Sequence, residues 1–103
     1  MRAQTKATNI PDKVKKRVLE RDKGYCIICG QRGDPVAHYI SRAQGGLGVE
    51  ENIVTLCWMC HHTYDQTTKR AEYRKYIRAY LQSKYPGWDE NSLIYRKGHD
   101  NAE

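Results

Sequence analysis

Four cysteines, arranged as two CxxC pairs, constrain this chain more than any other feature. Cys26 and Cys29 form the first pair, Cys57 and Cys60 form the second, and the sequence contains no other cysteine. The chain has 103 residues, 29% of them charged, and it has no phenylalanine. A domain this small and this polar often needs a metal ion or disulfides to stay folded. We therefore expect the cysteines to cross-link the fold, through a bound metal ion or through disulfides.

Structural zinc accounts for the two pairs best. Each CxxC turn presents two thiolate sulfurs to one side of an ion, and two such turns complete the tetrahedron that Zn²⁺ prefers. The alternatives are two disulfides or a redox-active CxxC. A redox motif usually lies in a βαβ context that this sequence lacks, and disulfides rarely persist in a reducing cytosol. A four-cysteine zinc has no open position for substrate, so it would be a scaffold rather than a catalyst.

The two ends of the chain are basic and the middle is mildly acidic, with a net charge of +6 overall. Basic flanks suit a polyanion such as nucleic acid, and an acidic middle suits a bound cation. Solvated lysines and arginines are common on any surface, so charge alone does not decide between these interpretations. No segment approaches the ~20 apolar residues of a membrane helix. The first residues, MRAQTKATNIPDK, lack the apolar part of a secretory signal, so we expect a cytoplasmic protein without a membrane partner.

Hydrophobic periodicity and turn residues predict a small α+β domain. Helices are expected over 11–22 and 69–84, with a short helix following the second CxxC. Strands are expected over 36–40 and 53–56, joined by a glycine-rich loop over 41–52. The later helix carries an apolar stripe that we interpret as core: Tyr73, Tyr76, Ile77, Tyr80 and Leu81.

The predicted elements divide the chain into three parts. Residues 1–10 are expected to be a flexible basic arm, residues 11–85 the folded domain, and residues 86–103 a C-terminal tail with weak signals. Pro11 and Asp12 suit the first turn of a helix, and Gly24 suits its end.

A histidine, an asparagine and a second histidine accompany the cysteines in a defined order. His38 lies on the first predicted strand, Asn52 precedes the second strand, and His61 follows the last cysteine directly. With these residues, the segment AHYISRAQGGLGVEENIVTLCWMCHHTYD, residues 37–65, resembles the HNH endonuclease family. It is especially similar to small phage-encoded HNH proteins. The resemblance implies a zinc-stapled, treble-clef-like ββα-metal core flanked by N- and C-terminal helices, and metal-dependent hydrolysis of DNA.

The resemblance also implies a role for each residue of this set. His38 would be the general base, because a neutral imidazole accepts a proton near pH 7. Asn52 would hold the loop and orient that base, and His61 would bind a catalytic ion such as Mg²⁺ or Mn²⁺. Asp65 lies four residues after His61 and would share its helix face, so we infer a second ligand. It could equally be a surface carboxylate. The family usually has an Asp or His ligand where this chain has Ala37.

Several basic residues are candidates for contacts with the DNA backbone. Such contacts position a protein on DNA without reading its sequence. Each of these side chains could also be ordinary surface, as could His62. The candidates are Arg42, Lys15, Lys16 and Arg74.

Two other functions remain compatible with the same cysteines. A zinc finger could bind nucleic acid without cutting it, and a zinc-stabilised domain could act as an adaptor between proteins. For the phage proteins, the resemblance implies genome processing beside a terminase, which makes a terminase a candidate partner in addition to DNA.

Overall fold

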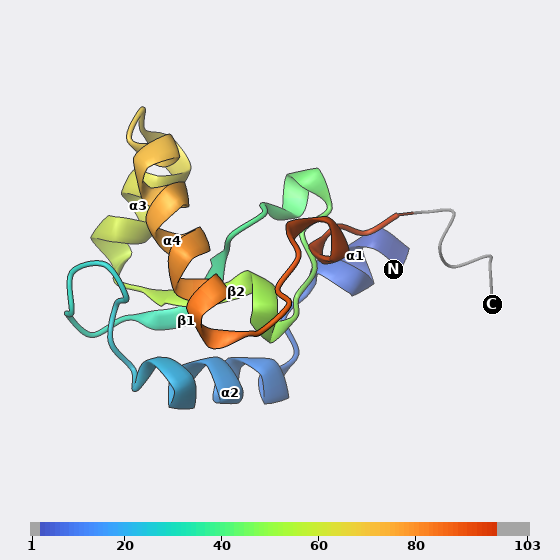
Figure 1. The fold of residues 1–103 in the computed structure, drawn as a ribbon, viewed down its shortest axis with the longest axis horizontal. Helices are drawn as coiled ribbons and strands as arrows, with labels where there is room; N and C mark the ends of the chain where they lie inside the picture. The colour runs from blue at the N-terminus through green and yellow to red at the C-terminus, as the bar shows by residue number, and fades with distance from the viewer. Residues whose placement is uncertain (1–2, 97–103) are drawn as a thin grey trace.

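A two-stranded antiparallel sheet lies at the centre of the protein, with helices on both of its sides (Figure 1). The structure is a computed structural model, and it describes residues 3–96. Three short 3₁₀ turns, η1 (Arg42–Gln44), η2 (Glu50–Asn52) and η3 (Glu90–Leu93), lie among the longer elements. In chain order, those elements are α1 (Ala3–Thr8), α2 (Asp12–Asp22), β1 (Asp34–His38), β2 (Ile53–Leu56), α3 (Trp58–Gln66) and α4 (Arg70–Lys84).

Strand β2 is the most buried element, because all four of its residues are covered. It pairs with β1 in the register Ala37 to Val54 and His38 to Ile53. Alternate residues of a strand face opposite sides of the sheet. Ile53 accordingly packs with the valines of α2, whereas Val54 belongs to the larger core that includes α4. A strand covered on both sides explains why residues 53–56 form an apolar, β-branched run.

Helix α2 is anchored to the sheet by a buried ion pair at its last turn. Asp22 accepts two hydrogen bonds from Arg21, one from the Thr55 backbone N–H at 2.9 Å, and one from Tyr80. Burial opposes ionisation of Asp22, but these donors, led by Arg21, hold its pKa below the usual value. Arg21 also donates to the backbone oxygen of Ile53 at 2.7 Å. The carboxylate thus connects α2 with β2 and α4.

The predicted α+β class is confirmed, and most elements lie close to their predicted positions. The predicted strand at 36–40 lies at Asp34–His38 instead. Its pairing register is irregular between Asp34 and Ala37, and Tyr39 and Ile40 leave the sheet to enter the core. Tyr76 is the one member of the predicted apolar stripe that is mostly exposed.

The two ends of the described chain are more ordered than the sequence predicts. Residues 3–8, expected to belong to a flexible arm, form helix α1, whose last residue Thr8 is buried. Residues 86–96, expected to be a tail, return to the core. Trp88 packs edge-on against Tyr39 at a ring distance of 5.6 Å, and Leu93 is buried. Apolar side chains explain the packing at the C-terminal end, because Leu93 belongs to the larger core and Trp88 packs against it. Residues 1–2 and 97–103 of the predicted arm and tail lie outside the described residues.

Among residues 3–96, no helix has the length and apolar character needed to cross a bilayer.

Candidate functional site

The four cysteines converge on one point, as the sequence predicts. The Sγ atoms of Cys26, Cys29, Cys57 and Cys60 all lie within 4.8 Å of one another, and none forms a disulfide. Cys29 Sγ and Cys57 Sγ are 3.5 Å apart. Zinc–sulfur bonds of about 2.3 Å in a tetrahedron place neighbouring sulfurs about 3.8 Å apart. Four free thiols at this spacing fit a structural Zn²⁺, and we call them the cysteine cluster.

Backbone N–H groups favour the thiolate of Cys26, whereas burial and the neighbouring thiols raise the pKa of Cys60. Burial opposes ionisation of Cys26, yet the backbone N–H groups of Cys29, Cys57 and Ile28 bring its pKa down to about 7. Cys57 is also the N-cap of α3, and its sulfur accepts a hydrogen bond from the Cys60 N–H at 3.4 Å. The same residue therefore starts the helix and supplies a sulfur to the cluster.

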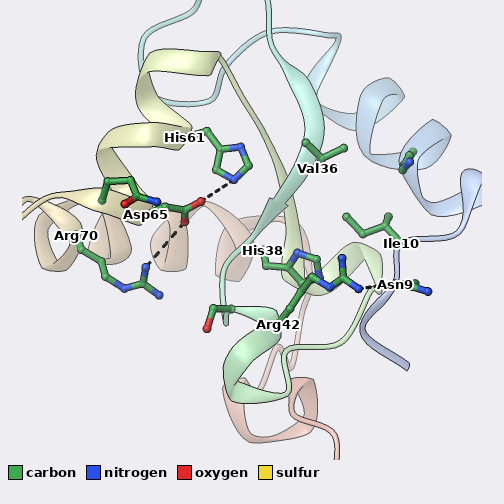
Figure 2. A pocket seen from close by; sticks show the side chains of 11 residues that line it. Asn9, Ile10, Val36, His38, Arg42, His61, Asp65 and Arg70 are labelled. Carbon is green, nitrogen blue, oxygen red and sulfur yellow. Dashed lines mark hydrogen bonds and ion pairs between the residues drawn. The ribbon is translucent and has the colours of Figure 1, made fainter. Parts of the chain in front are cut away.

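A second site lies beside the cluster, in a cleft of about 770 Å³ that we call the His38 cleft. Figure 2 shows His38 and Arg42 on one side of this opening and His61 and Asp65, both carried by α3, on the other. The fold therefore brings the predicted base and the predicted ion ligands to one cavity. The cleft is lined by Asn9, Ile10, Lys15, Val36, His38, Ser41, Arg42, His61, Asp65, Gln66 and Arg70.

The His38 ring is held by helix α1. Its Nε2 atom lies 2.9 Å from the backbone oxygen of Thr8. A carbonyl oxygen only accepts hydrogen bonds, so Nε2 must carry the proton, and Nδ1 of the neutral ring is left as an acceptor. Burial lowers the pKa of His38, the Thr8 carbonyl opposes this shift, and the charges of Arg42 and His61 reinforce it. The ring is therefore neutral at pH 7 and able to take up a proton.

Asn52 is fully buried and ties the glycine-rich loop to the end of β1. Its side-chain oxygen accepts from the Ile40 N–H at 2.9 Å, while its amide nitrogen donates to the backbone oxygens of Ile40 at 3.2 Å and Leu47 at 2.8 Å. Ile40 lies two residues beyond His38 in the chain. These contacts suit the loop-holding role that the resemblance implies for Asn52.

Two glycines let this loop pass close to other backbone. A Cβ added at Gly46 would lie 1.7 Å from the Ile40 oxygen, and one at Gly48 would lie 1.9 Å from the Asn9 oxygen. The Gly48 N–H also donates to the backbone oxygen of Ala7 at 3.0 Å. The loop thus holds the end of α1 next to His38.

His61 and Asp65 form the pair that could hold a divalent ion. Their Nε2 and Oδ2 atoms are 3.1 Å apart, one helical turn from each other on α3. Adjacent ligands of an octahedral ion with bonds of about 2.1 Å are about 3.0 Å apart, so this spacing fits. An imidazole and a carboxylate together suit Mn²⁺ or a similar transition ion, and the carboxylate also suits Mg²⁺.

No third ligand of the usual kinds completes this pair. Within residues 3–96, the only group of three or more clustered His, Cys, Asp or Glu ligand atoms is the cysteine cluster. Ala37, where the family usually has a ligand, is buried in the core. The remaining positions around an ion would therefore fall to water and to phosphate oxygens, as Mg²⁺ sites often allow.

The predicted basic residues separate into two groups. Lys15 and Arg42 line the cleft, whereas Arg74 pairs with Glu90 at 2.8 Å outside it, and Lys16 is exposed on α2 and does not line it. Arg42 also bonds to the side-chain oxygen of Asn9.

Sequence reasoning missed several groups at this site, and two of them contact the predicted base or a predicted ion ligand. Arg70, which begins α4, lines the cleft and lies 3.9 Å from Asp65. The backbone oxygen of Thr8 contacts His38. Neither has a sequence signal, because Arg70 stands among other basic residues and a backbone oxygen has no residue type.

Comparison with known families agrees with this geometry. A family model described as HNH endonuclease matches residues 26–67. The matched segment contains both cysteine pairs and the residues His38, Asn52, His61 and Asp65. No curated protein matches the chain.

Proposed function

We propose, from the premise that residues 26–67 are an HNH endonuclease domain, that this protein hydrolyses DNA phosphodiester bonds with a divalent ion. One observation carries the proposal. A neutral imidazole with a free Nδ1 lines the same cleft as a histidine–carboxylate pair. Hydrolysis of a phosphodiester needs a base for water and positive charge near the phosphate. The His38 cleft offers groups for both.

His38 acts first on the attacking water. Nδ1 accepts a proton from the water as its oxygen forms a bond to phosphorus, and the bond from phosphorus to the 3′ oxygen breaks. The 3′ oxygen takes up a proton from solvent and leaves as a hydroxyl, and the phosphate remains on the 5′ end, as the family resemblance implies. The Thr8 carbonyl keeps Nε2 protonated throughout and therefore keeps Nδ1 directed at the water.

His61 and Asp65 would hold the divalent ion on the opposite side of the cleft. When bound, the ion supplies Lewis-acid charge to the phosphate and the leaving oxygen. The cationic side chains of Lys15, Arg42 and Arg70 bind the DNA backbone around the cleft and align the scissile phosphate. Asn52 acts at a distance by holding the loop that follows His38.

The proposal is tested by plasmid cleavage with Mg²⁺ and Mn²⁺. His38→Ala is expected to reduce the rate by about 10²- to 10⁴-fold, as loss of a general base does, with unchanged zinc content. Val36→Thr is the matched control, because Val36 lies on the same strand, lines the same cleft and cannot exchange a proton. Equal rates for wild type and His38→Ala would overturn the assignment of the base.

The same assay separates the alternatives. A plasmid left intact with every ion, together with salt-sensitive DNA binding, would identify a zinc-finger binding module. Absence of salt-sensitive binding would favour a protein adaptor. A role in phage genome processing beside a terminase rests on the resemblance of residues 37–65. Faster cleavage in the presence of the terminase from the same genome would support it.

A further inference from the structure

The first turn of α3 exposes two large apolar side chains that the proposed chemistry does not use. Trp58 is 76% exposed and Met59 is 70% exposed, although the two lie between the buried residues Cys57 and Cys60. Tryptophan is usually well covered in a folded domain. An indole kept in solvent beside a candidate active site therefore calls for a partner.

The indole of Trp58 is held in place by a second ring. It stacks on the imidazole of His62, one turn further along α3, with ring centres 5.3 Å apart and planes 9° from parallel. This stack orients the indole while leaving most of it open to solvent. The stacked pair thus presents a flat aromatic face on the surface of α3.

This stack adjoins the His38 cleft. A small hollow of about 190 Å³ is lined by Trp58, His61, His62, Asp65 and Gln66, and three of these residues, His61, Asp65 and Gln66, also line the cleft. The hollow is polar apart from the indole, unlike the apolar groove that a docked protein segment usually fills. A DNA strand whose phosphate occupies the cleft would carry a base past this surface.

We propose that Trp58, backed by His62, is a stacking platform for a nucleobase of the strand that is cut; this inference rests on the proposed nuclease function. Bases stack on aromatic side chains with little regard to sequence, because every base has a flat π face. Within a duplex, both faces of a base are covered by its neighbours. The platform therefore favours DNA with an unpaired or unstacked base beside the cleavage site.

The test measures binding without cleavage, in the His38→Ala background. The two probes are a short thymidine oligonucleotide and an abasic oligonucleotide with the same number of phosphates. Trp58→Ala is expected to weaken binding to the first probe by about ten-fold and to leave binding to the abasic probe unchanged. Trp58→Phe keeps an aromatic ring and should therefore retain part of the difference in affinity between the thymidine and abasic probes. Met59→Ala is the matched control, since it removes an equally exposed apolar side chain from the same turn.

Each other outcome has a defined meaning. The platform would be overturned if Trp58→Ala lost affinity equally for both probes, or lost affinity for neither. The platform would also be overturned if Trp58→Ala changed self-association in sedimentation but left DNA affinity unchanged. That result would assign the surface to a contact between protein molecules. If Trp58 controls the difference in affinity between the probes but the protein with its natural His38 cuts no DNA, the nuclease fails, and Trp58 is a base-stacking surface of a DNA-binding module instead. Cleavage without any role for Trp58 is the reverse result. Absence of binding to either probe would also overturn the platform, and plasmid cleavage would then decide the nuclease function alone.

Discussion

The cysteine cluster and the His38 cleft share helix α3 but differ in almost every physical property. The cluster has four sulfur donors, three of them buried, and these would fill all four positions of a tetrahedral zinc ion. The cleft has nitrogen and oxygen donors, and the side chain of Asp65 is 42% exposed. Cys60 and His61 are neighbours in sequence, but successive residues of a helix point about 100° apart. One helix can therefore hold a closed scaffold with one face and present an open site with the next.

This contrast predicts that damage to the two regions has different consequences. A structural zinc contributes folding free energy directly, whereas an ion in an open cleft adds little to the stability of a fold already formed. We therefore expect substitutions in the cysteine cluster to unfold the protein, and substitutions in the His38 cleft to stop cleavage while the fold remains intact.

The largest expected effect is loss of the fold in Cys57→Ser. Serine is a good N-cap, so α3 keeps its capping group while the cluster loses a thiolate. Zinc binding contributes about 10–16 kcal/mol in small zinc domains, more than the stability of most single domains. We expect an unfolded chain by circular dichroism and no bound zinc. His61→Ala is the control, with normal zinc content, a normal spectrum and no cleavage. A folded, zinc-loaded Cys57→Ser would contradict the scaffold role.

Asp65→Asn should affect the ion of the cleft without affecting the fold. The substitution removes the carboxylate charge but keeps the shape, and we expect the half-saturating Mn²⁺ concentration for cleavage to rise by about ten-fold or more. The melting temperature should change little, because Asp65 is exposed. Glu72→Gln on α4 removes an exposed carboxylate outside the cleft and should not alter the Mn²⁺ dependence. An unchanged Mn²⁺ titration in Asp65→Asn would remove Asp65 from the ligand set.

The parts of the structure that could be predicted from sequence are those set by local pattern. The CxxC spacing predicts the sulfur cluster, and the β-branched run at 53–56 predicts β2 within its observed bounds. The 3.6-residue periodicity predicts α2 and α4 to within one residue at each end. In each case, the signal lies within a few neighbouring residues.

The parts that could not be predicted depend on contacts between distant segments. Helix α1 is held by bonds to the loop and to His38, and the return of residues 86–96 depends on Trp88 meeting Tyr39. Arg70 reaches the cleft only because the chain turns sharply between α3 and α4. These contacts leave no local pattern, yet they complete the site.

Removal of residues 1–8 tests one such distant contact and should slow cleavage moderately. The truncated chain loses the Thr8 oxygen that holds the His38 ring, and a single hydrogen bond of this kind is worth about three- to ten-fold in rate. Zinc content should stay constant, because the cysteine cluster makes no use of α1. Nitrogen NMR of His38 should show a mixture of tautomers in place of the Nε2–H form. Lys6→Ala, an exposed change on α1, is the control. Full activity of the truncated protein would show that α1 has no part in the cleft.

The smallest expected effect is a shift in pH dependence caused by Arg42→Gln. The rate depends on neutral His38, whose pKa is lowered by burial and further by the charge of Arg42, so the acid limb of the wild-type profile should have its midpoint below 6.5. Removing that charge makes protonation easier. The pKa of His38 then rises, and kcat/KM is lost at a pH higher by a fraction of a unit, because the pH dependence of kcat/KM reports the protein without bound DNA.

Arg74→Gln provides the matched comparison for this shift, because it also removes one arginine charge but at a residue paired with Glu90 outside the cleft. Its acid limb should coincide with that of the wild type. The cysteine cluster lies outside the reach of both substitutions, so zinc content stays constant in each. Equal upward shifts in both variants would mean that the charge of the whole protein, rather than the local field of the cleft, sets the protonation of His38. A downward shift in Arg42→Gln would contradict the effect assigned to the Arg42 charge.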